Sequence, residues 1–72
     1  MPVIHVNLLE GRSTDAKRAL AADVTQAVCR HLGVKPAQVR VIFHDVRRED
    51  WSVGGVLYSD RDDGASADLG AP

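Results

Sequence analysis

The stretch GRSTDAKRALAADVTQAVCRHLGVKP, residues 11–36, decides the fold because it predicts one long helix. Ser13 or Thr14 can cap the first turn through a side-chain oxygen. Apolar residues then recur at helical spacing, at Leu20, Val24, Ala27, Val28 and Leu32. Gly33 and Pro36 are typical residues beyond a helix end. These signals together predict a helix of about five turns.

A strand is predicted on each side of this helix. In PVIHVNLL, residues 2–9, apolar and polar side chains alternate, which is typical of a strand with one apolar face. QVRVIFHDV, residues 38–46, alternates in the same way, and its two faces carry Val39, Val41 and Phe43 against Arg40, Ile42 and His44. A strand, a crossover helix and a second strand form a βαβ unit, in which the strands are parallel and the crossover is right-handed.

The predicted two-stranded sheet has one face that its own helix leaves uncovered. Parallel sheets occur almost only with both faces covered. A chain of 72 residues also buries only roughly 60% of the surface that its unfolded form exposes. The single cysteine, Cys29, cannot close an internal disulfide. We therefore expect other copies of the chain to cover the free face.

The remaining residues predict a small hairpin and an acidic tail. Gly54 and Gly55 separate two short apolar pairs in WSVGGVLYSD, residues 51–60, which favours a hairpin that could reach onto a neighbouring subunit. From Asp60 onward the chain is rich in Asp, Gly, Ala and Ser and has little apolar content to order it. The sequence thus predicts one domain over residues 1–59 and a flexible acidic tail over residues 60–72.

Charge and hydropathy exclude several classes of protein. Nine Lys and Arg against ten Asp and Glu leave a net charge of −1, which argues against a nucleic-acid partner bound through a basic surface. No apolar run approaches the ~20 residues of a membrane helix, and no charged segment leads into an apolar one as in a secretory signal. We therefore expect a cytoplasmic protein with no membrane partner.

The metal-ligating residue types do not fall at metal-binding spacings. His5, His31 and His44 form neither an HxH nor an HExxH pattern, so no metal site is predicted. His5 and His44 are instead expected to border the face between subunits. Cys29 lies within the predicted helix and is interpreted as a small buried hydrophobe.

Pro2 is a candidate catalytic base. Initiator methionine is generally removed before a small residue such as proline, which would leave Pro2 with a free secondary amine. An α-amino group ordinarily titrates near ~7.7 to 8, and nearby cations or an apolar pocket lower that value. A base with a pKa near neutrality suits proton transfer. The alternative interpretation is a proline that only shields the chain terminus.

Arg12, Arg40 and Trp51 are candidate partners of Pro2. Arg12 opposes the helix dipole at the N-terminal end, so it is either a solvated loop residue or a ligand-binding one. Arg40 interrupts the apolar run VRVIF and would seek an anion once its face is covered. Two guanidinium groups suit a substrate with two carboxylates. Trp51 either anchors a small satellite core or covers the amine and excludes water.

The segments PVIHVNLLEGRS, VRVIF and WSVGG, in this order and spacing, resemble the 4-oxalocrotonate tautomerase family of the tautomerase superfamily. The resemblance spans Pro2 to about Tyr58. It implies an α+β, tautomerase/MIF-like fold, in which a βαβ subunit with a parallel two-stranded sheet carries a short C-terminal hairpin. It also implies dimers that assemble into a homohexamer, a trimer of dimers, with sites shared between subunits.

The family resemblance further implies a cofactor-independent keto–enol tautomerase and a role for each site residue. The substrate class is a small dicarboxylate or dienoic acid such as 2-hydroxymuconate, usually met in the catabolism of aromatic compounds, and the product is a 2-oxo-3-enedioate. Pro2 resembles the general base, Arg12 the clamp on the distal carboxylate, and Arg40 the group that binds the 2-oxygen and its neighbouring carboxylate. Leu9 and Trp51 resemble pocket-lining residues, with Trp51 standing where the family has phenylalanine. No cofactor or metal is implied.

Two alternatives stay open at this point. Related hydratases and dehalogenases resemble this chain but add a carboxylate near the pocket aromatic, where this chain has Ser52 and Val53; Glu49 or Asp50 could substitute. The second alternative is a non-catalytic oligomeric module in which the same residues only hold subunits together. Retention of Met1 would support that module because it would turn the Pro2 nitrogen into an amide.

Overall fold

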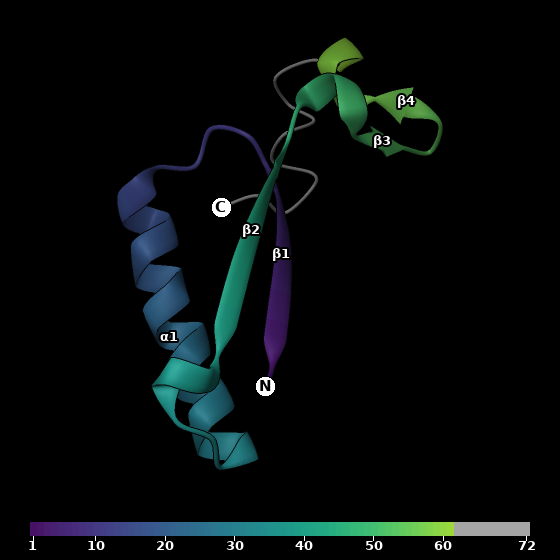
Figure 1. Ribbon diagram of the computed structural model, residues 1–72. Coiled ribbons are helices and arrows are strands. Elements are labelled where there is room, and N and C mark those ends of the chain that lie inside the picture. Colours follow the sequence, from purple (N-terminus) through teal and green to yellow (C-terminus); the bar gives the residue numbers. More distant parts are fainter. Residues whose placement is uncertain (62–72) are drawn as a thin grey trace.

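The computed structural model describes residues 1–61, and its larger part is a βαβ unit (Figure 1). Strand β1 spans Val3–Leu9, helix α1 Thr14–Leu32 and strand β2 Arg40–Val46. The two strands pair in parallel, with Val3 opposite Arg40 and Leu9 opposite Val46. The predicted fold class is confirmed. Of the tail predicted over residues 60–72, Asp60, at the end of a 3-10 helix, and Arg61 are described, and the rest lies outside the described residues.

Helix α1 begins and ends at the predicted signals. The Ser13 side-chain oxygen accepts a hydrogen bond from the Ala16 backbone N–H at 3.0 Å. Gly33 adopts a left-handed conformation with φ of 68°, and its N–H donates to the Cys29 carbonyl oxygen. Glycine takes this conformation without the steric cost that a side chain would bring. Both ends of the helix are therefore determined by local contacts.

The apolar stripe of α1 is buried less than its spacing predicts. Leu32 is 63% exposed, Leu20 is more than a third exposed, and no residue of α1 is fully buried. Cys29, interpreted from the sequence as a buried hydrophobe, is a half-buried free thiol. The physical reason is that α1 packs on only two strands, which are too narrow to cover the whole stripe.

The alternation along the strands separates an inner from an outer face. The inner side chains turn toward α1 and are half-buried, and they include Ile4, Val6, Leu8, Val41 and Phe43. The outer side chains are exposed, namely Val3, His5, Asn7, Arg40, Ile42 and His44. Helix α1 runs along one side of the two strands, and within residues 1–61 no element covers the other side (Figure 1). The predicted uncovered face is present.

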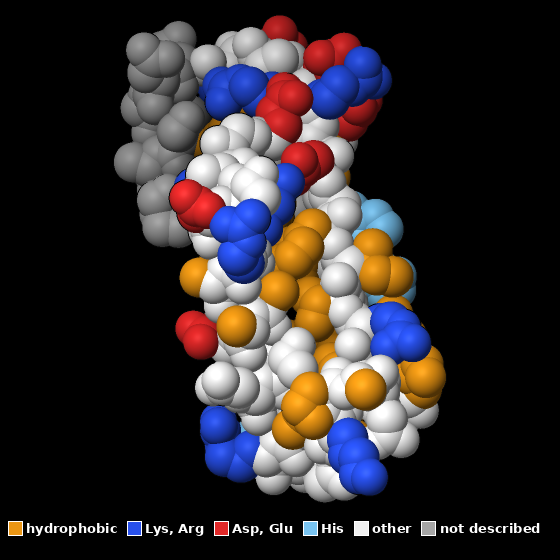
Figure 2. All heavy atoms as spheres, turned by 60° about the vertical axis from the view of Figure 1, so that its left-hand side comes forward, with side chains coloured by type: hydrophobic (Ala, Val, Ile, Leu, Met, Phe, Trp, Pro, Cys, Tyr) orange, Lys and Arg blue, Asp and Glu red, His pale blue; other side chains and the backbone are white. Residues whose placement is uncertain are grey.

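The buried core of the described chain is small. Only Val39 and Tyr58 among the hydrophobic residues 1–61 are buried. Apolar side chains remain visible along the length of the molecule between its charged ends (Figure 2). Seven large hydrophobic side chains among residues 1–61 are exposed: Met1, Val3, Leu20, Leu32, Ile42, Val56 and Leu57. No helix within residues 1–61 combines the length and apolar character that crossing a membrane requires.

The C-terminal part is a hairpin that projects from the end of β2. Strand β3, Ser52–Val53, pairs antiparallel with β4, Val56–Leu57. Gly54 and Gly55 join them with φ of 63° and 83°, as a two-residue turn with both central residues at positive φ requires. The hairpin predicted at the two glycines is confirmed. The hairpin extends away from the βαβ unit beyond the end of β2 (Figure 1).

Three single-turn 3-10 helices connect or follow these elements, and the sequence interpretation missed them. They span Pro36–Gln38, Arg48–Asp50 and Tyr58–Asp60. The second of them lies directly before Trp51. Its first residue, Arg48, is half-buried against the ring of Tyr58.

Candidate active site

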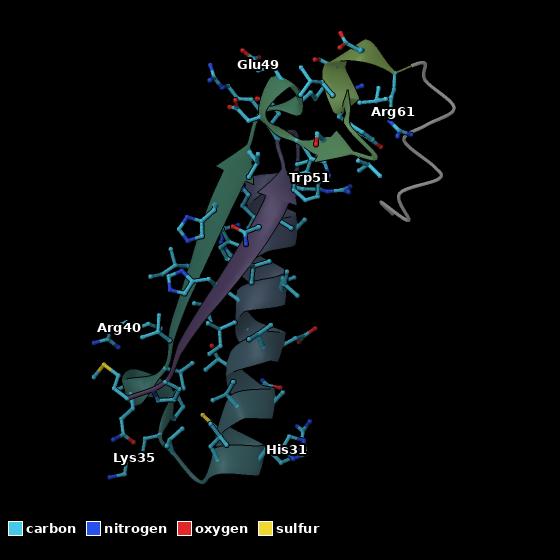
Figure 3. All side chains as sticks on the ribbon, turned by 90° about the vertical axis from the view of Figure 1, so that its right-hand side faces the viewer. His31, Lys35, Arg40, Glu49, Trp51 and Arg61 are labelled. Carbon is cyan, nitrogen blue, oxygen red and sulfur yellow. The ribbon has the colours of Figure 1, made fainter. Side chains whose placement is uncertain are left out.

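Pro2 and Arg40 are neighbours across the two strands. The Arg40 backbone N–H donates to the Pro2 carbonyl oxygen at 3.0 Å. Pro2 is half-buried, whereas Arg40 is exposed and points away from α1 (Figure 3). An Arg40 guanidinium N–H donates to the Ala37 carbonyl oxygen at 2.9 Å, which fixes the direction of the side chain. One chain therefore brings the candidate base and one candidate arginine to the same end of the sheet.

Arg12 lies at the opposite end of the sheet from Pro2. The seven residues of β1 separate them, and at about 3.3 Å per residue the strand alone spans roughly 20 Å. Leu9 is the last residue of β1 and is half-buried at that far end. A single chain therefore does not bring Arg12 or Leu9 to Pro2.

Arg12 lines a hollow between β1 and α1. The hollow has a volume of about 210 Å³ and is lined by Leu8, Arg12, Ala16, Lys17 and Leu20. Arg12 is half-buried there. Lys17 donates to the Asp45 carboxylate at 2.7 Å and so ties α1 to β2 beside the hollow. The walls are apolar and carry two cationic side chains, Arg12 and Lys17. They suit an acidic ligand or an acidic, partly apolar surface of another chain.

Trp51 also lies at the end of the sheet away from Pro2. It follows β2, and Figure 3 shows Trp51 and Arg40 at opposite ends of the strands. The side chain is half-buried. The Trp51 carbonyl oxygen accepts a hydrogen bond from the Tyr58 backbone N–H at 2.8 Å, which holds the start of the hairpin. The position of the tryptophan therefore depends on the hairpin arm.

The contacts that hold the hairpin arm, residues 51–61, in place were not predicted from the sequence. Tyr58 is 1% exposed, and the Arg48 guanidinium carbon lies 4.8 Å from the centre of its ring. The Arg61 guanidinium donates to the Val53 carbonyl oxygen at 3.0 Å. The single tyrosine of the chain, placed directly after a hairpin, was the signal that could have revealed the anchor.

The imidazole rings of His5 on β1 and His44 on β2 are in contact. His5 Nδ1 and His44 Nε2 lie 2.8 Å apart on the outer face. His31 lies on α1 and not on the strands (Figure 3). Within residues 1–61, no three His, Cys, Asp or Glu side chains gather in a way that could hold a metal ion. The absence of a cofactor stays a prediction.

Comparison with known proteins decides the family. The family described as "Tautomerase enzyme" matches residues 2–61. The chain belongs to the 4-oxalocrotonate tautomerase family. Members of this family are isomerases, and the tautomerase described above is therefore an isomerase. The resemblance inferred from the terminal proline, LLEGR, VRV and the aromatic residue before GG is confirmed.

Similar proteins cover nearly all of the described tautomerase. A probable tautomerase of Ralstonia nicotianae is 40% identical over 60 residues, which are 83% of this chain and 92% of that relative. A 2-hydroxymuconate tautomerase of Comamonas testosteroni is 43% identical over 56 residues, or 78% of this chain and 89% of its own.

Solved structures agree with the fold. A crystal structure of a 4-oxalocrotonate tautomerase homologue matches with a TM-score of 0.83 at 47% identity, over 86% of this chain and 98% of that one. A heterohexamer 4-oxalocrotonate tautomerase of Chloroflexus aurantiacus matches with a TM-score of 0.78 at 35% identity, over 83% and 97%.

The acidic residues before Trp51 are engaged on the surface of the tautomerase. The Arg47 guanidinium donates to Asp50 at 3.0 Å and lies 3.6 Å from Glu49. The hydrogen bond and negative charge of Asp50, with the charge of Glu49, raise the pKa of Arg47 above its ordinary value. Both carboxylates thus have a cationic partner within three residues.

Proposed function

We propose that this tautomerase converts 2-hydroxymuconate or a close dienoic dicarboxylate to the conjugated 2-oxo-3-enedioate without a cofactor. The observation that supports this proposal most is the hydrogen bond from the Arg40 N–H to the Pro2 carbonyl oxygen. It places a guanidinium-bearing residue directly beside the residue that becomes the chain terminus when Met1 is removed.

The proposed base is the secondary amine of Pro2. In its neutral form the amine takes the proton of the substrate's 2-hydroxyl group and returns a proton to C5. The electron pair of the O–H bond becomes the C2=O bond, and the double bonds shift toward C5, so that atoms and charge balance. A cationic neighbour such as Arg40 disfavours the protonated amine, which keeps the base usable near neutral pH.

Arg40 has the proposed role of stabilising the negative charge that develops on the 2-oxygen. Its contact with the Ala37 carbonyl uses one guanidinium N–H, and the arginine side chain has five such donors in a planar fork. The others can bind the 2-oxygen and the adjacent carboxylate. Preorganised donors at a developing oxyanion commonly supply the largest single catalytic effect.

Arg12 has the proposed role of binding the distal carboxylate, and Leu9 and Trp51 that of lining the pocket. These three residues lie at the end of the sheet away from Pro2, at a distance of roughly 20 Å along β1. A six-carbon substrate cannot bridge that distance. The proposal therefore requires that Arg12, Leu9 and Trp51 reach Pro2 from another copy of the chain.

Self-association is accordingly part of the proposal, with a homohexamer built as a trimer of dimers. It is supported by the uncovered face of the sheet, by the exposed apolar side chains and by the projecting hairpin. The similar protein of Chloroflexus aurantiacus is a heterohexamer. We further propose that the protein acts in the cytoplasm, in the catabolism of aromatic compounds.

Hydration and dehalogenation need a carboxylate that activates water beside the pocket aromatic. Ser52 and Val53 occupy the positions after Trp51. Glu49 and Asp50, the two acids that could substitute, are engaged by Arg47. These contacts favour tautomerisation over the addition of water.

The test is an assay of 2-hydroxymuconate ketonisation by ultraviolet absorbance, with the N-terminus defined by mass spectrometry. We expect the chain that begins at Pro2 to be active and the chain that keeps Met1 to be inactive. Pro2→Ala, which changes the base, should lower kcat by about a hundredfold. Arg30→Ala, at an exposed position on α1, is the matched control for surface changes.

Two results would contradict the proposal. One is the absence of ketonisation by a chain shown to begin at Pro2. The other is a Pro2→Ala variant as fast as the wild type. Either result, found for a correctly assembled oligomer, would favour the non-catalytic module.

A further inference from the structure

A closed cycle of three hydrogen bonds holds the backbone of Trp51. The Trp51 N–H donates to the Arg48 carbonyl oxygen at 3.4 Å, and the Trp51 carbonyl oxygen accepts from the Tyr58 N–H at 2.8 Å. The Tyr58 carbonyl oxygen in turn accepts from Arg48 Nη2 at 3.3 Å. Both backbone polar groups of the tryptophan are therefore engaged, and the side chain of Arg48 closes the cycle.

The bond from Arg48 to Tyr58 joins two segments that lie on either side of the hairpin. Arg48 begins the 3-10 helix before Trp51, and Tyr58 begins the 3-10 helix after β4. The Arg48 guanidinium also lies over the Tyr58 ring, with its carbon 4.8 Å from the ring centre. The ring is buried and Arg48 is half-buried, and a cation over an aromatic ring is held more strongly when water is excluded. One side chain thus clamps the two ends of the hairpin together.

The hairpin has little else to fix its direction. Its strands β3 and β4 are two residues long each, and so short a pair is marginal by itself in water. A further contact, from the Arg61 guanidinium to the Val53 carbonyl oxygen, lies within the hairpin arm. It does not tie the arm to the segment before Trp51. The contacts of Arg48 with Tyr58 do.

The neighbouring arginine makes contacts of another kind. Arg47 is exposed and pairs with the carboxylates of Asp50 and Glu49. Within residues 1–61 no carboxylate forms an ion pair with Arg48. Exposed ion pairs contribute little to stability. Of two adjacent arginines, only Arg48 therefore binds the residue that holds Trp51, and Arg47 is its matched control.

We propose that Arg48 is a positioning residue of the active site, which holds Trp51 through Tyr58 in the orientation that lines the pocket and so sets the affinity for the substrate. The proposal rests on the proposed function, in which Trp51 lines the pocket and Pro2 is the base. Arg48 itself touches neither the substrate nor the reacting atoms. Its effect passes through Trp51.

The kinetic signature of this role differs from that of the base. A side chain that lines the pocket contacts the substrate in the ground state and in the transition state alike. Loss of such uniform binding raises KM and leaves kcat unchanged, whereas loss of a group that acts only in the transition state lowers kcat. Removal of the Arg48 side chain should therefore change KM, and a change of Pro2 should change kcat.

The test is the ketonisation of 2-hydroxymuconate by the full chain that begins at Pro2. We expect Arg48→Ala to raise KM by about five- to tenfold with kcat within about twofold of the wild type. Arg47→Ala should keep the KM of the wild type. Trp51→Ala should raise KM at least as much as Arg48→Ala. In the Trp51→Ala background, adding Arg48→Ala should change KM by less than about twofold, because the side chain that Arg48 positions is already absent.

The outcomes separate this inference from the proposed function. A wild type without ketonisation overturns the proposed function. In an active wild type, three results overturn only the role of Arg48: an unchanged KM in Arg48→Ala, an equal rise of KM in Arg47→Ala, and KM effects of Arg48→Ala and Trp51→Ala that multiply in the double variant.

A second measurement needs no activity. Trp51 is the single tryptophan of the chain, so its fluorescence reports on this side chain alone. We expect acrylamide to quench the fluorescence more strongly in Arg48→Ala than in the wild type, and equally in Arg47→Ala and the wild type. If Arg48→Ala does not assemble, Arg48→Lys replaces it in both measurements, because lysine keeps the charge and lacks the planar fork. Equal quenching in the wild type and the Arg48 variant overturns the proposal.

Discussion

The Arg48 guanidinium carbon lies 4.8 Å from the ring centre of Tyr58, and Arg48 Nη2 donates to the Tyr58 carbonyl oxygen at 3.3 Å. The same tyrosine donates its backbone N–H to Trp51. These contacts fix the direction of the hairpin arm. They also fix the position of Trp51, the aromatic side chain that we propose for the pocket.

Removal of the Tyr58 ring should destabilise the hairpin arm. Tyr58→Ala removes a ring that is 1% exposed, and the loss of a buried aromatic side chain typically costs about 3 to 5 kcal/mol. Tyr58→Phe keeps the ring and its contact with Arg48, so a smaller loss is expected. Urea denaturation followed by Trp51 fluorescence measures both variants. Equal stability of Tyr58→Ala and the wild type would show that the ring is not an anchor.

Two defective chains should restore activity when they are mixed. Pro2→Ala replaces the secondary amine of the proposed base with a primary one, Arg12→Ala removes the proposed clamp, and the structure places these residues at opposite ends of one strand. If the site is shared, refolding the two variants together forms some sites with an intact Pro2 from one chain and an intact Arg12 from the other.

The measurement is ketonisation activity of the co-refolded mixture against the two variants refolded separately. Activity above the sum of the separate samples is the expected result. Mass spectrometry checks that mixed oligomers form. If they form and the activity of the mixture only equals the sum of the separate activities, each chain completes its own site. Pro2→Ala mixed with Arg30→Ala serves as the control for exchange of subunits.

Loss of the helix cap should lower stability by a modest amount. The Ser13 side chain accepts a hydrogen bond from the Ala16 N–H, and replacing such a cap by alanine costs about 1 kcal/mol. Thr14→Ala, at the next position, is the matched control with an expected change near zero. Chemical denaturation of both variants checks the prediction, which is wrong if the two changes are equal.

The surface carboxylates before Trp51 should not be required for tautomerisation. Glu49→Gln and Asp50→Asn remove the charges that face Arg47, and exposed ion pairs contribute about 0 to 1 kcal/mol. We expect ketonisation within about twofold of the wild type. A loss of a hundredfold or more in either variant would give that carboxylate a catalytic role and would favour the hydratase or dehalogenase alternative.

The sequence by itself determined the order of the two long strands, the helix and the hairpin, and the ends of the helix, but not the three 3-10 helices. Ser13 and Gly33 bound α1 because a cap and a left-handed glycine act within a few residues, and Gly54–Gly55 form a turn for the same local reason. The alternation of residues 2–9 and 38–46 assigned the inner and outer faces correctly. The terminal proline and the arginines of the candidate site were also visible as a family pattern.

Only the tertiary structure decided which of these residues meet. It places Arg40 beside Pro2 and Arg12 at the far end of β1, and it pairs His5 with His44 across 39 positions of the chain. It also buries Tyr58 under Arg48 and leaves the ends of the α1 stripe exposed. The physical reason is that such contacts depend on strand register and on the width of the sheet, which no short window of sequence encodes.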